Sequence, residues 1–191
     1  MTRLKNVNLD SLIALVNELK TKLNLLQTLA LYAPLGNPGF QIKTNFDIEN
    51  SLAFPYVNGG TLKNVAVSQT WDTGTAATFP QGRFGAALLS MTASATRLVT
   101  WFTNSTSGYA SEAAAIAAIT LPDTDVTALG YATVQAHAGN SFTAGTDALT
   151  GGSGGNVAAA TTYYNLLNPN SLRLTTLTSY VIPGSAEDFY K

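Results

Sequence analysis

A ladder of apolar residues near the N-terminus constrains this chain more than any other feature. Its members alternate in spacing between three and four: Leu9, Leu12, Val16, Leu19, Leu23, Leu26, Ala30 and Ala33. A period of 3.5 residues is the seam of a coiled coil. Asn8 is a suitable N-cap, and Pro34 followed by Gly36 ends the pattern. The ladder therefore predicts one helix from about residue 8 to residue 33.

Such a helix needs a partner, because an isolated helix about 39 Å long is only marginally stable in water. The partner could be the rest of the chain or further copies of the same helix. The strict 3.5-residue period favours copies, since a helix on the surface of a globular domain more often follows 3.6. Further apolar residues widen the face: Ile13, Leu15, Leu25, Leu29 and Leu31. This width fits a trimer better than a dimer, or a helix that also docks on a neighbour.

From Phe40 onward the pattern changes to alternation with a period of two, separated by turn residues. The strongest turn is Asn58-Gly59-Gly60, which predicts a hairpin. Strands are predicted over residues 40–48, 52–57, 61–69, 78–79, 84–92, 97–103, 129–136, 141–144 and 156–165, and a short helix capped by Ser111 over 112–119.

The predicted fold is mainly β with an N-terminal α-helix: an antiparallel β-sandwich or small barrel preceded by a coiled-coil-like helix. The sequence divides into an oligomerisation helix and linker (1–39), a β-rich domain (40–165) and a C-terminal extension (166–191). The extension carries one more predicted strand, over residues 172–182.

Charge and composition exclude several functions. The net charge is −1 with 11% charged residues, so no basic field is available to bind nucleic acid. The apolar stretch 12–33 is interrupted by Glu18, Lys20 and Lys22 and is not expected to span a membrane, and residues 1–10 show no secretion signal. The chain has no cysteine, which excludes disulfides and thiolate sites. A surface with few ions suits close packing of subunits.

No group of residues predicts catalysis or a cofactor. His137 is the only histidine and is expected in a surface loop. Asp123 and Asp125, with Asp72 or Asp147, lack the glycine and glutamate of a calcium loop. Asp47 and Glu49 are interpreted as strand-edge charges, and Gly151–Gly155 lacks the Lys-Ser/Thr of a phosphate loop. We therefore predict that the protein is not an enzyme.

Two tryptophans could contact a partner or a glycan. Trp101 lies in an apolar strand and is expected in the core. Trp71 precedes Asp72 and Gly74 in an expected loop, and it is the better candidate for an exposed contact.

A series of short motifs resembles a recurrent module of tailed-bacteriophage virion proteins. Its pieces are Phe54-Pro55-Tyr56-Val57-Asn58-Gly59-Gly60, Phe79-Pro80-Gln81-Gly82-Arg83-Phe84, Leu121-Pro122, Leu129-Gly130-Tyr131, Phe142-Thr143-Ala144-Gly145-Thr146 and Tyr163-Tyr164. The resemblance covers residues 52–165. It implies a structural role on the virion, as a head decoration or cement protein or in a fibre, and it implies no catalytic residues.

The predicted function is therefore that of a homotrimeric capsid decoration or cement protein in the virion, assembled in the host cytoplasm. Its partners would be copies of itself and the major capsid protein or another virion protein. The predicted oligomer interface is Leu9, Leu12, Val16, Leu19, Leu23 and Leu26, and the predicted partner contacts are Trp71, Leu172 and Leu174. The alternative is a tail-fibre or receptor-binding protein that contacts a glycan.

Overall fold

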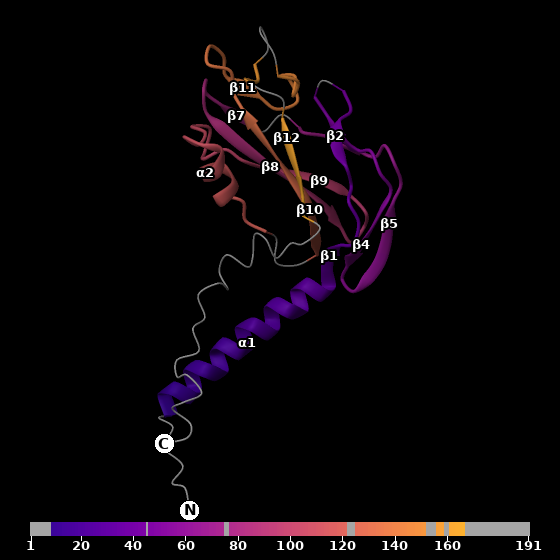
Figure 1. Ribbon diagram of the computed structural model, residues 1–191, viewed down its shortest axis with the longest axis vertical. Coiled ribbons are helices and arrows are strands. Elements are labelled where there is room, and N and C mark those ends of the chain that lie inside the picture. Colours follow the sequence, from indigo (N-terminus) through magenta and orange to yellow (C-terminus); the bar gives the residue numbers. More distant parts are fainter. Residues whose placement is uncertain are drawn as a thin grey trace, which may run out of the picture.

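The fold is that of a computed structural model, which describes residues 9–44, 46–74, 77–121, 125–151, 156–158 and 161–166. It opens with one long helix, α1 (Leu9–Leu31), about 35 Å long at 1.5 Å per residue. Figure 1 shows α1 extending away from a β-rich body. The predicted N-terminal helix is thus confirmed, and the predicted cap Asn8 lies outside the described residues.

The helix ends two residues earlier than its apolar ladder predicts. The chain passes directly into β1 (Tyr32–Pro34), in which Tyr32 pairs with Asn58 and Ala33 with Val57. The physical reason is Pro34, because the residue before a proline is disfavoured in the α conformation. The end of α1 is therefore joined to the β domain without a flexible linker.

The remaining elements are strands with one short helix. They are β2 (Phe40–Ile42), β3 (Ile48–Asn50), β4 (Phe54–Asn58), β5 (Thr61–Val65), β6 (Thr70–Trp71), β7 (Thr78–Phe79), β8 (Phe84–Thr92), β9 (Arg97–Phe102), α2 (Glu112–Ala117), β10 (Val126–Gln135), β11 (Phe142–Thr143) and β12 (Thr162–Asn165). A mainly β protein with an N-terminal helix is confirmed.

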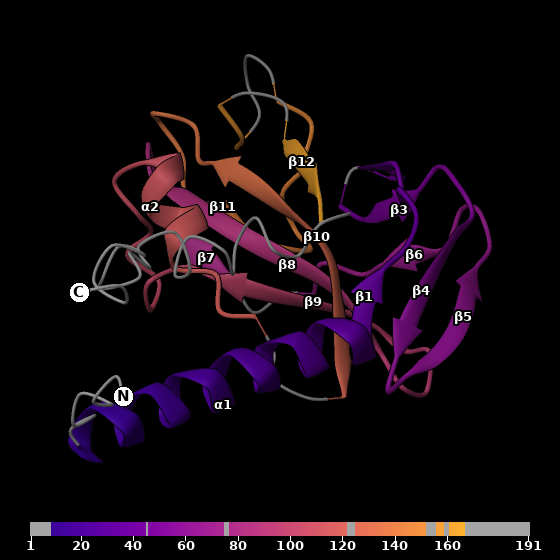
Figure 2. The same cartoon turned by 60° about the horizontal axis from the view of Figure 1, so that its bottom comes forward.

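The described strands form four antiparallel sheets, in the orders β1-β4-β5, β12-β10-β8-β9, β11-β7 and β2-β3-β6. Figure 2 shows the four-stranded sheet at the centre of the body, with β1, β4 and β5 at the end that meets α1. These sheets do not close into a barrel, so the barrel alternative is not the arrangement of the described strands.

Local turn chemistry predicted some boundaries well. Asn58 pairs with Thr61, and Gly59 and Gly60 between them have φ of 58° and 75°, as a tight hairpin turn requires. Ser111 caps α2 by accepting a hydrogen bond from the backbone N–H of Ala114. The hairpin and the capped helix are both confirmed.

The predicted strand over residues 40–48 is wrong in its middle. The chain turns back after β2, and the backbone N–H of Lys43 donates to the carbonyl of Asp47 at 2.9 Å. Phe46, which continues the apolar alternation, is exposed in this turn. The chain forms the β2-β3 hairpin instead of one continuous strand because the hairpin pairs Phe40 with Asn50 and Ile42 with Ile48.

One apolar core joins all four sheets. It includes Phe40, Ile48 and Trp71 from β2-β3-β6, and it continues through Phe54 and Tyr56 of β4, Leu89 of β8, Leu129 and Val134 of β10, and Phe79 and Phe142 of β7 and β11. A second, smaller cluster of Leu88, Ala128 and Leu166 forms on the other face of the four-stranded sheet. The central sheet therefore buries side chains on both faces.

The predicted exposed contact at Trp71 is wrong. Its side chain is 0% exposed and packs edge-on against the ring of Phe40, with 5.1 Å between ring centroids. Its Nε1 donates to the carbonyl of Ser90, 3.3 Å away. Trp101, expected in the core, is half-buried against it and donates from Nε1 to the carbonyl of Thr73. Trp71 is thus a core residue of β6.

Candidate functional site

The candidate site is the apolar seam of α1, and the structure leaves this seam exposed. Leu12 is 47% exposed, Val16 54%, Leu19 57% and Leu23 55%. For Leu9 and Leu26, the structure describes the helical backbone but not the side chain. A cluster of large exposed apolar side chains indicates an interaction site, whereas single exposed apolar residues do not.

The apolar face is wider than the seam alone. Ile13 and Leu15 flank it and are 50% and 45% exposed. In a heptad that places Leu12 and Leu19 at d and Val16 and Leu23 at a, Ile13 is at e and Leu15 at g. Over this N-terminal half of α1, four adjacent heptad positions are therefore apolar and exposed.

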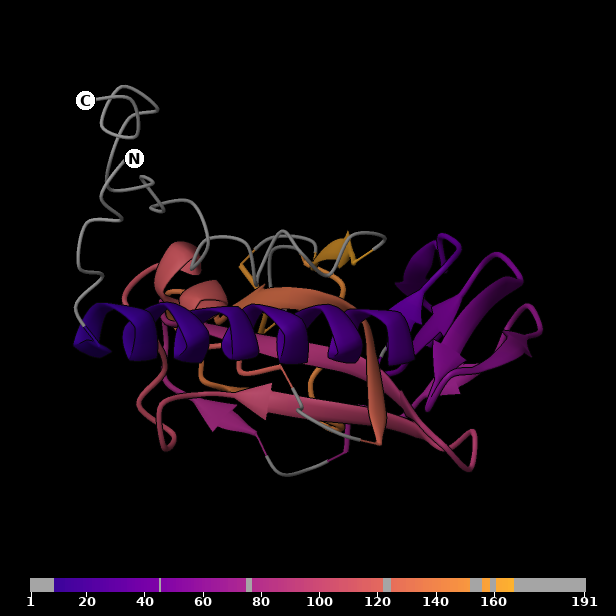
Figure 3. The same ribbon diagram turned by 90° about the horizontal axis from the view of Figure 1, so that it is seen from below.

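Among the described residues, the contacts between the β domain and α1 lie mainly near the end of the helix. The backbone N–H of Gly60, in the β4-β5 turn, donates to the carbonyl of Leu31 at 3.1 Å. The contacts of α1 with other elements are concentrated on β1 and β4. Viewed from below, the helix crosses in front of the strands (Figure 3), whereas the first view separates it from them. The seam therefore lies beside the domain and is not packed into it.

Polar side chains lie opposite the seam on α1 and also beside it, since Lys22 is at the same heptad position as Leu15. Lys22 forms an ion pair with Glu18 at 2.6 Å, four residues apart along the helix. The hydroxyl of Thr21 donates to the carbonyl of Asn17 at 3.0 Å. Because both side chains are only half-buried, a pair with this spacing stabilises a helix by only about 0.3–0.5 kcal/mol. Polar contacts therefore contribute little to holding α1 in place, and its apolar face is the larger source of possible stabilisation.

The acidic residues singled out from the sequence do not gather into a site. Asp72 accepts from the backbone N–H of Gly74 at 2.8 Å, and Asp147 from that of Thr143 at 2.5 Å. No group of three or more His, Cys, Asp or Glu that could hold a metal ion occurs among the described residues. Asp123 lies outside them. Asp72 acts within its own loop, and Asp147 also accepts from the side-chain amide of Asn156.

The other candidates for chemistry are also engaged locally. The Nδ1 of His137 accepts from the backbone N–H of Gly139 at 3.2 Å, which assigns it to the turn. Glu49 accepts from the side-chain amide of Gln41 across the β2-β3 pair at 2.9 Å. Residues 152–155 of the glycine loop lie outside the described residues.

A polar cluster around Glu112 was not found from the sequence. Its Oε1 accepts hydrogen bonds from the hydroxyl of Thr133 at 2.6 Å and from that of Tyr164 at 3.0 Å. The ring of Tyr164 stacks on that of Tyr131, with centroids 4.6 Å apart. Burial first, and then the nearby carboxylate of Glu112, raise the pKa of Tyr164 and of Tyr131. The cluster joins α2 to β10 and β12.

The signal for that cluster was the tyrosine pair Tyr163-Tyr164, which in a strand must face opposite ways. Tyr163 packs on the main core, and Tyr164 bonds Glu112 on the other face. Which face held an acid could not be inferred, because Glu112 and Tyr164 are 52 residues apart.

Comparison with protein-family models, with curated proteins and with solved structures gives no significant match. Among the described residues, no helix is both long enough and apolar enough to cross a membrane.

Proposed function

We propose that this chain is a non-enzymatic structural protein that self-associates through α1. The observation that carries the proposal is the exposure of Leu12, Val16, Leu19 and Leu23 along one seam with coiled-coil spacing. In the proposed assembly the helices pack as a coiled coil and the β domains are displayed at its C-terminal end. The unit of action is the assembly and not a catalytic pocket.

The size of the seam supports this proposal. Full burial of a Leu or Val side chain contributes about 1.5–3 kcal/mol. Since each of the four seam side chains is about half exposed, packing them against a partner contributes about 3–6 kcal/mol per helix as an upper estimate. This is enough to drive association when several helices meet and each buries the same face.

A homotrimer fits the width of the face best. Ile13 and Leu15 extend the exposed apolar surface on both sides of the seam. A two-stranded coiled coil buries mainly its a and d positions, whereas each added helix covers more of the flanking e and g positions. Three helices would cover Ile13 and Leu15 as well as the seam.

We further propose that the assembly is a head decoration or cement protein of a tailed-phage virion. The support is the ordered resemblance over residues 52–165 together with a surface poor in charge, which suits contact with the major capsid protein or another virion protein. In this proposal the β domain is a sandwich, since sheets β1-β4-β5 and β2-β3-β6 share one core with β12-β10-β8-β9. The fibre alternative loses Trp71, its better candidate for a glycan contact, because this side chain is buried.

Paired variants of α1 test self-association. Leu19→Asp with Leu23→Asp places two charges on the seam, where an assembly would have to bury them, so we expect only monomer in sedimentation analysis. The matched control is Asn17→Asp with Thr21→Asp, which places the same charges four residues apart on exposed positions off the seam. The control should associate as the parent does. Association of the seam variant at parental strength would contradict the proposal.

The virion assignment has its own test. Gold-labelled antibody against the β domain should decorate the heads of intact phage particles in electron micrographs. Label confined to tail fibres would favour the fibre alternative, and particles without label would contradict a virion role.

A further inference from the structure

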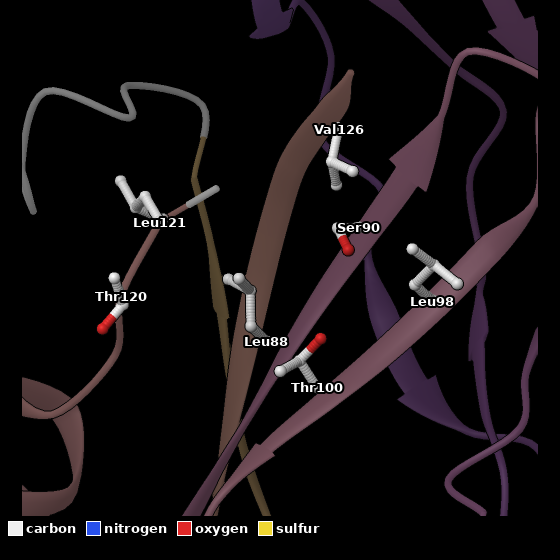
Figure 4. Close-up of a pocket in the computed structure, with 7 residues that line it drawn as sticks. All are labelled: Leu88, Ser90, Leu98, Thr100, Thr120, Leu121 and Val126. Carbon is white, nitrogen blue, oxygen red and sulfur yellow. The ribbon is translucent and has the colours of Figure 1, made fainter. Parts of the chain in front are cut away.

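The outer face of the four-stranded sheet carries an open pocket beside the small apolar cluster. Its volume is about 300 Å³. Figure 4 shows that it is bordered by β8, β9, β10 and the segment after α2. Its lining includes Leu88 and Ser90 of β8, Leu98 and Thr100 of β9, Leu121 after α2 and Val126 of β10. We call this the sheet-face pocket.

The pocket is apolar and uncharged, and only its floor is covered. Leu88 and Ser90 are buried, Leu98, Leu121 and Val126 are half-buried, and Thr100 is exposed. None of these side chains carries a charge or a catalytic group. The pocket therefore suits an apolar segment of polypeptide better than a polar small molecule.

The chain itself leads toward this pocket where the described residues end. Leu166 is 2% exposed and packs with Leu88, while Leu121 packs on the same cluster. The backbone N–H of Leu166 donates to the carbonyl of Leu129 at 2.8 Å. Since β12 runs antiparallel to β10, the chain at Leu166 is heading for the end of β10 that carries Val126.

The following sequence has matching chemistry and reach. Residues 167–191 include Leu172 and Leu174, with Arg173 as the one charge between positions 167 and 182. Leu172 lies six positions after Leu166, and this length of chain spans up to about 20 Å when extended. The pocket extends over β10, β8 and β9, which is two strand spacings or about 10 Å.

We propose that the sheet-face pocket is the docking site of this chain's own residues 172–182, with Leu172 and Leu174 packed over Leu88, Leu98 and Val126. From sequence we predicted that these two leucines contact a partner. The proposed docking instead places them in a pocket of the same chain, toward which the chain runs at Leu166. It does not depend on self-association through α1.

Thiol labelling of the full-length protein tests the proposal, because the chain has no cysteine of its own. Thr100→Cys reports on the pocket, and Thr61→Cys, at an exposed position of β5, is the control. We expect the cysteine at 100 to react about tenfold more slowly than that at 61, since labelling then requires the segment to open. Adding Leu172→Asp and Leu174→Asp should bring the two rates together, with no change at position 61.

Three results would overturn the proposal: equal rates in the parent protein, slow labelling that survives both Asp substitutions, or protection that disappears on dilution and so comes from a second copy. If the Asp variants fail to fold, oxidation of Thr100→Cys with Leu174→Cys decides. A disulfide within one chain supports the proposal, and no disulfide, or one between chains, contradicts it. The seam variant Leu19→Asp with Leu23→Asp should leave every result unchanged, which separates this test from that of the proposed function.

Discussion

Asn58 shows how one residue can serve both a local turn and the tertiary fold. Its Nδ2 donates to the carbonyls of Met91 and Asp125, both at 3.3 Å, and to the hydroxyl of Thr127 at 3.1 Å. The side chain is buried. It thereby ties the β4-β5 hairpin to β8 and β10. The hairpin could be predicted from Asn58-Gly59-Gly60, but these distant acceptors could not.

Replacing this amide should destabilise the β domain. Asn58→Ala removes the three hydrogen bonds that this buried amide donates, which we expect to lower the free energy of unfolding by about 1–3 kcal/mol. Urea unfolding at one protein concentration measures the change, since association would otherwise shift the result. Asn64→Ala, at an exposed position of β5, is the control and should be near neutral. Equal effects of the two substitutions would refute the role given to Asn58.

Because of Tyr163, we expect the folded protein to lose stability in alkali. Its hydroxyl is buried without a hydrogen-bond partner among the described residues, and burial raises its pKa well above the ordinary value of 10.0. The unfolded chain therefore loses this proton more readily than the folded one. The stabilisation from Tyr163 is complete below pH 10 and is lost as the pH rises above that value.

Tyr163→Phe should reduce the alkaline loss, because no phenol then ionises at this position. At neutral pH we expect the free energy of unfolding to stay within about 1 kcal/mol of the parent, since the removed hydroxyl makes no hydrogen bond. Tyr164→Phe is the contrasting variant: it breaks the hydrogen bond to Glu112 and should cost about 1 kcal/mol at neutral pH. Urea titrations on both sides of pH 10 measure both effects. An alkaline loss in Tyr163→Phe equal to the parent's would be inconsistent with this account.

At the scale of elements, β10 depends on a glycine, Gly130, at a point of close approach to its neighbours. The pairing register with β8 shifts between Ala128 and Gly130. A Cβ at Gly130 would lie 2.5 Å from the carbonyl oxygen of Tyr164 and 2.8 Å from the ring of Phe40. β12 and β2 therefore approach β10 too closely at this position for a side chain.

Gly130→Ala should therefore separate β10 from its neighbours and cost about 1–3 kcal/mol. Thermal unfolding followed by circular dichroism would show a lower midpoint. Gly139→Ala is the control, because a Cβ there meets only His137 at 3.7 Å. A midpoint for Gly130→Ala no lower than that of the control would show that the strand accommodates the side chain.

Elements could be predicted where the signal is local. The residue range of β8 matches its prediction, and α2 begins at its predicted cap. Trp71 was misplaced because Asp72 and Gly74 indicate a loop, whereas a two-residue strand, β6, and a ring contact with Phe40 place it in the core. The burial of Trp71 depends on contacts with residues distant in the sequence, and such contacts cannot be inferred from a local pattern.

At the scale of the whole molecule, the proposed assembly depends on what covers α1. The helix was predicted from its period, and its described seam residues are exposed beside the β domain. The candidate interface could therefore be predicted from sequence, because heptad spacing is itself local. The strand over residues 172–182, with Leu172 and Leu174, lies outside the described residues and stays a prediction.

The most direct test of self-association is the mass of the full-length protein in solution, measured by sedimentation equilibrium over a range of concentrations. Our account predicts a species of three times the 20.0 kDa chain mass that dissociates on dilution. A mass of 20.0 kDa at every concentration, with the seam leucines protected inside the monomer, would contradict it.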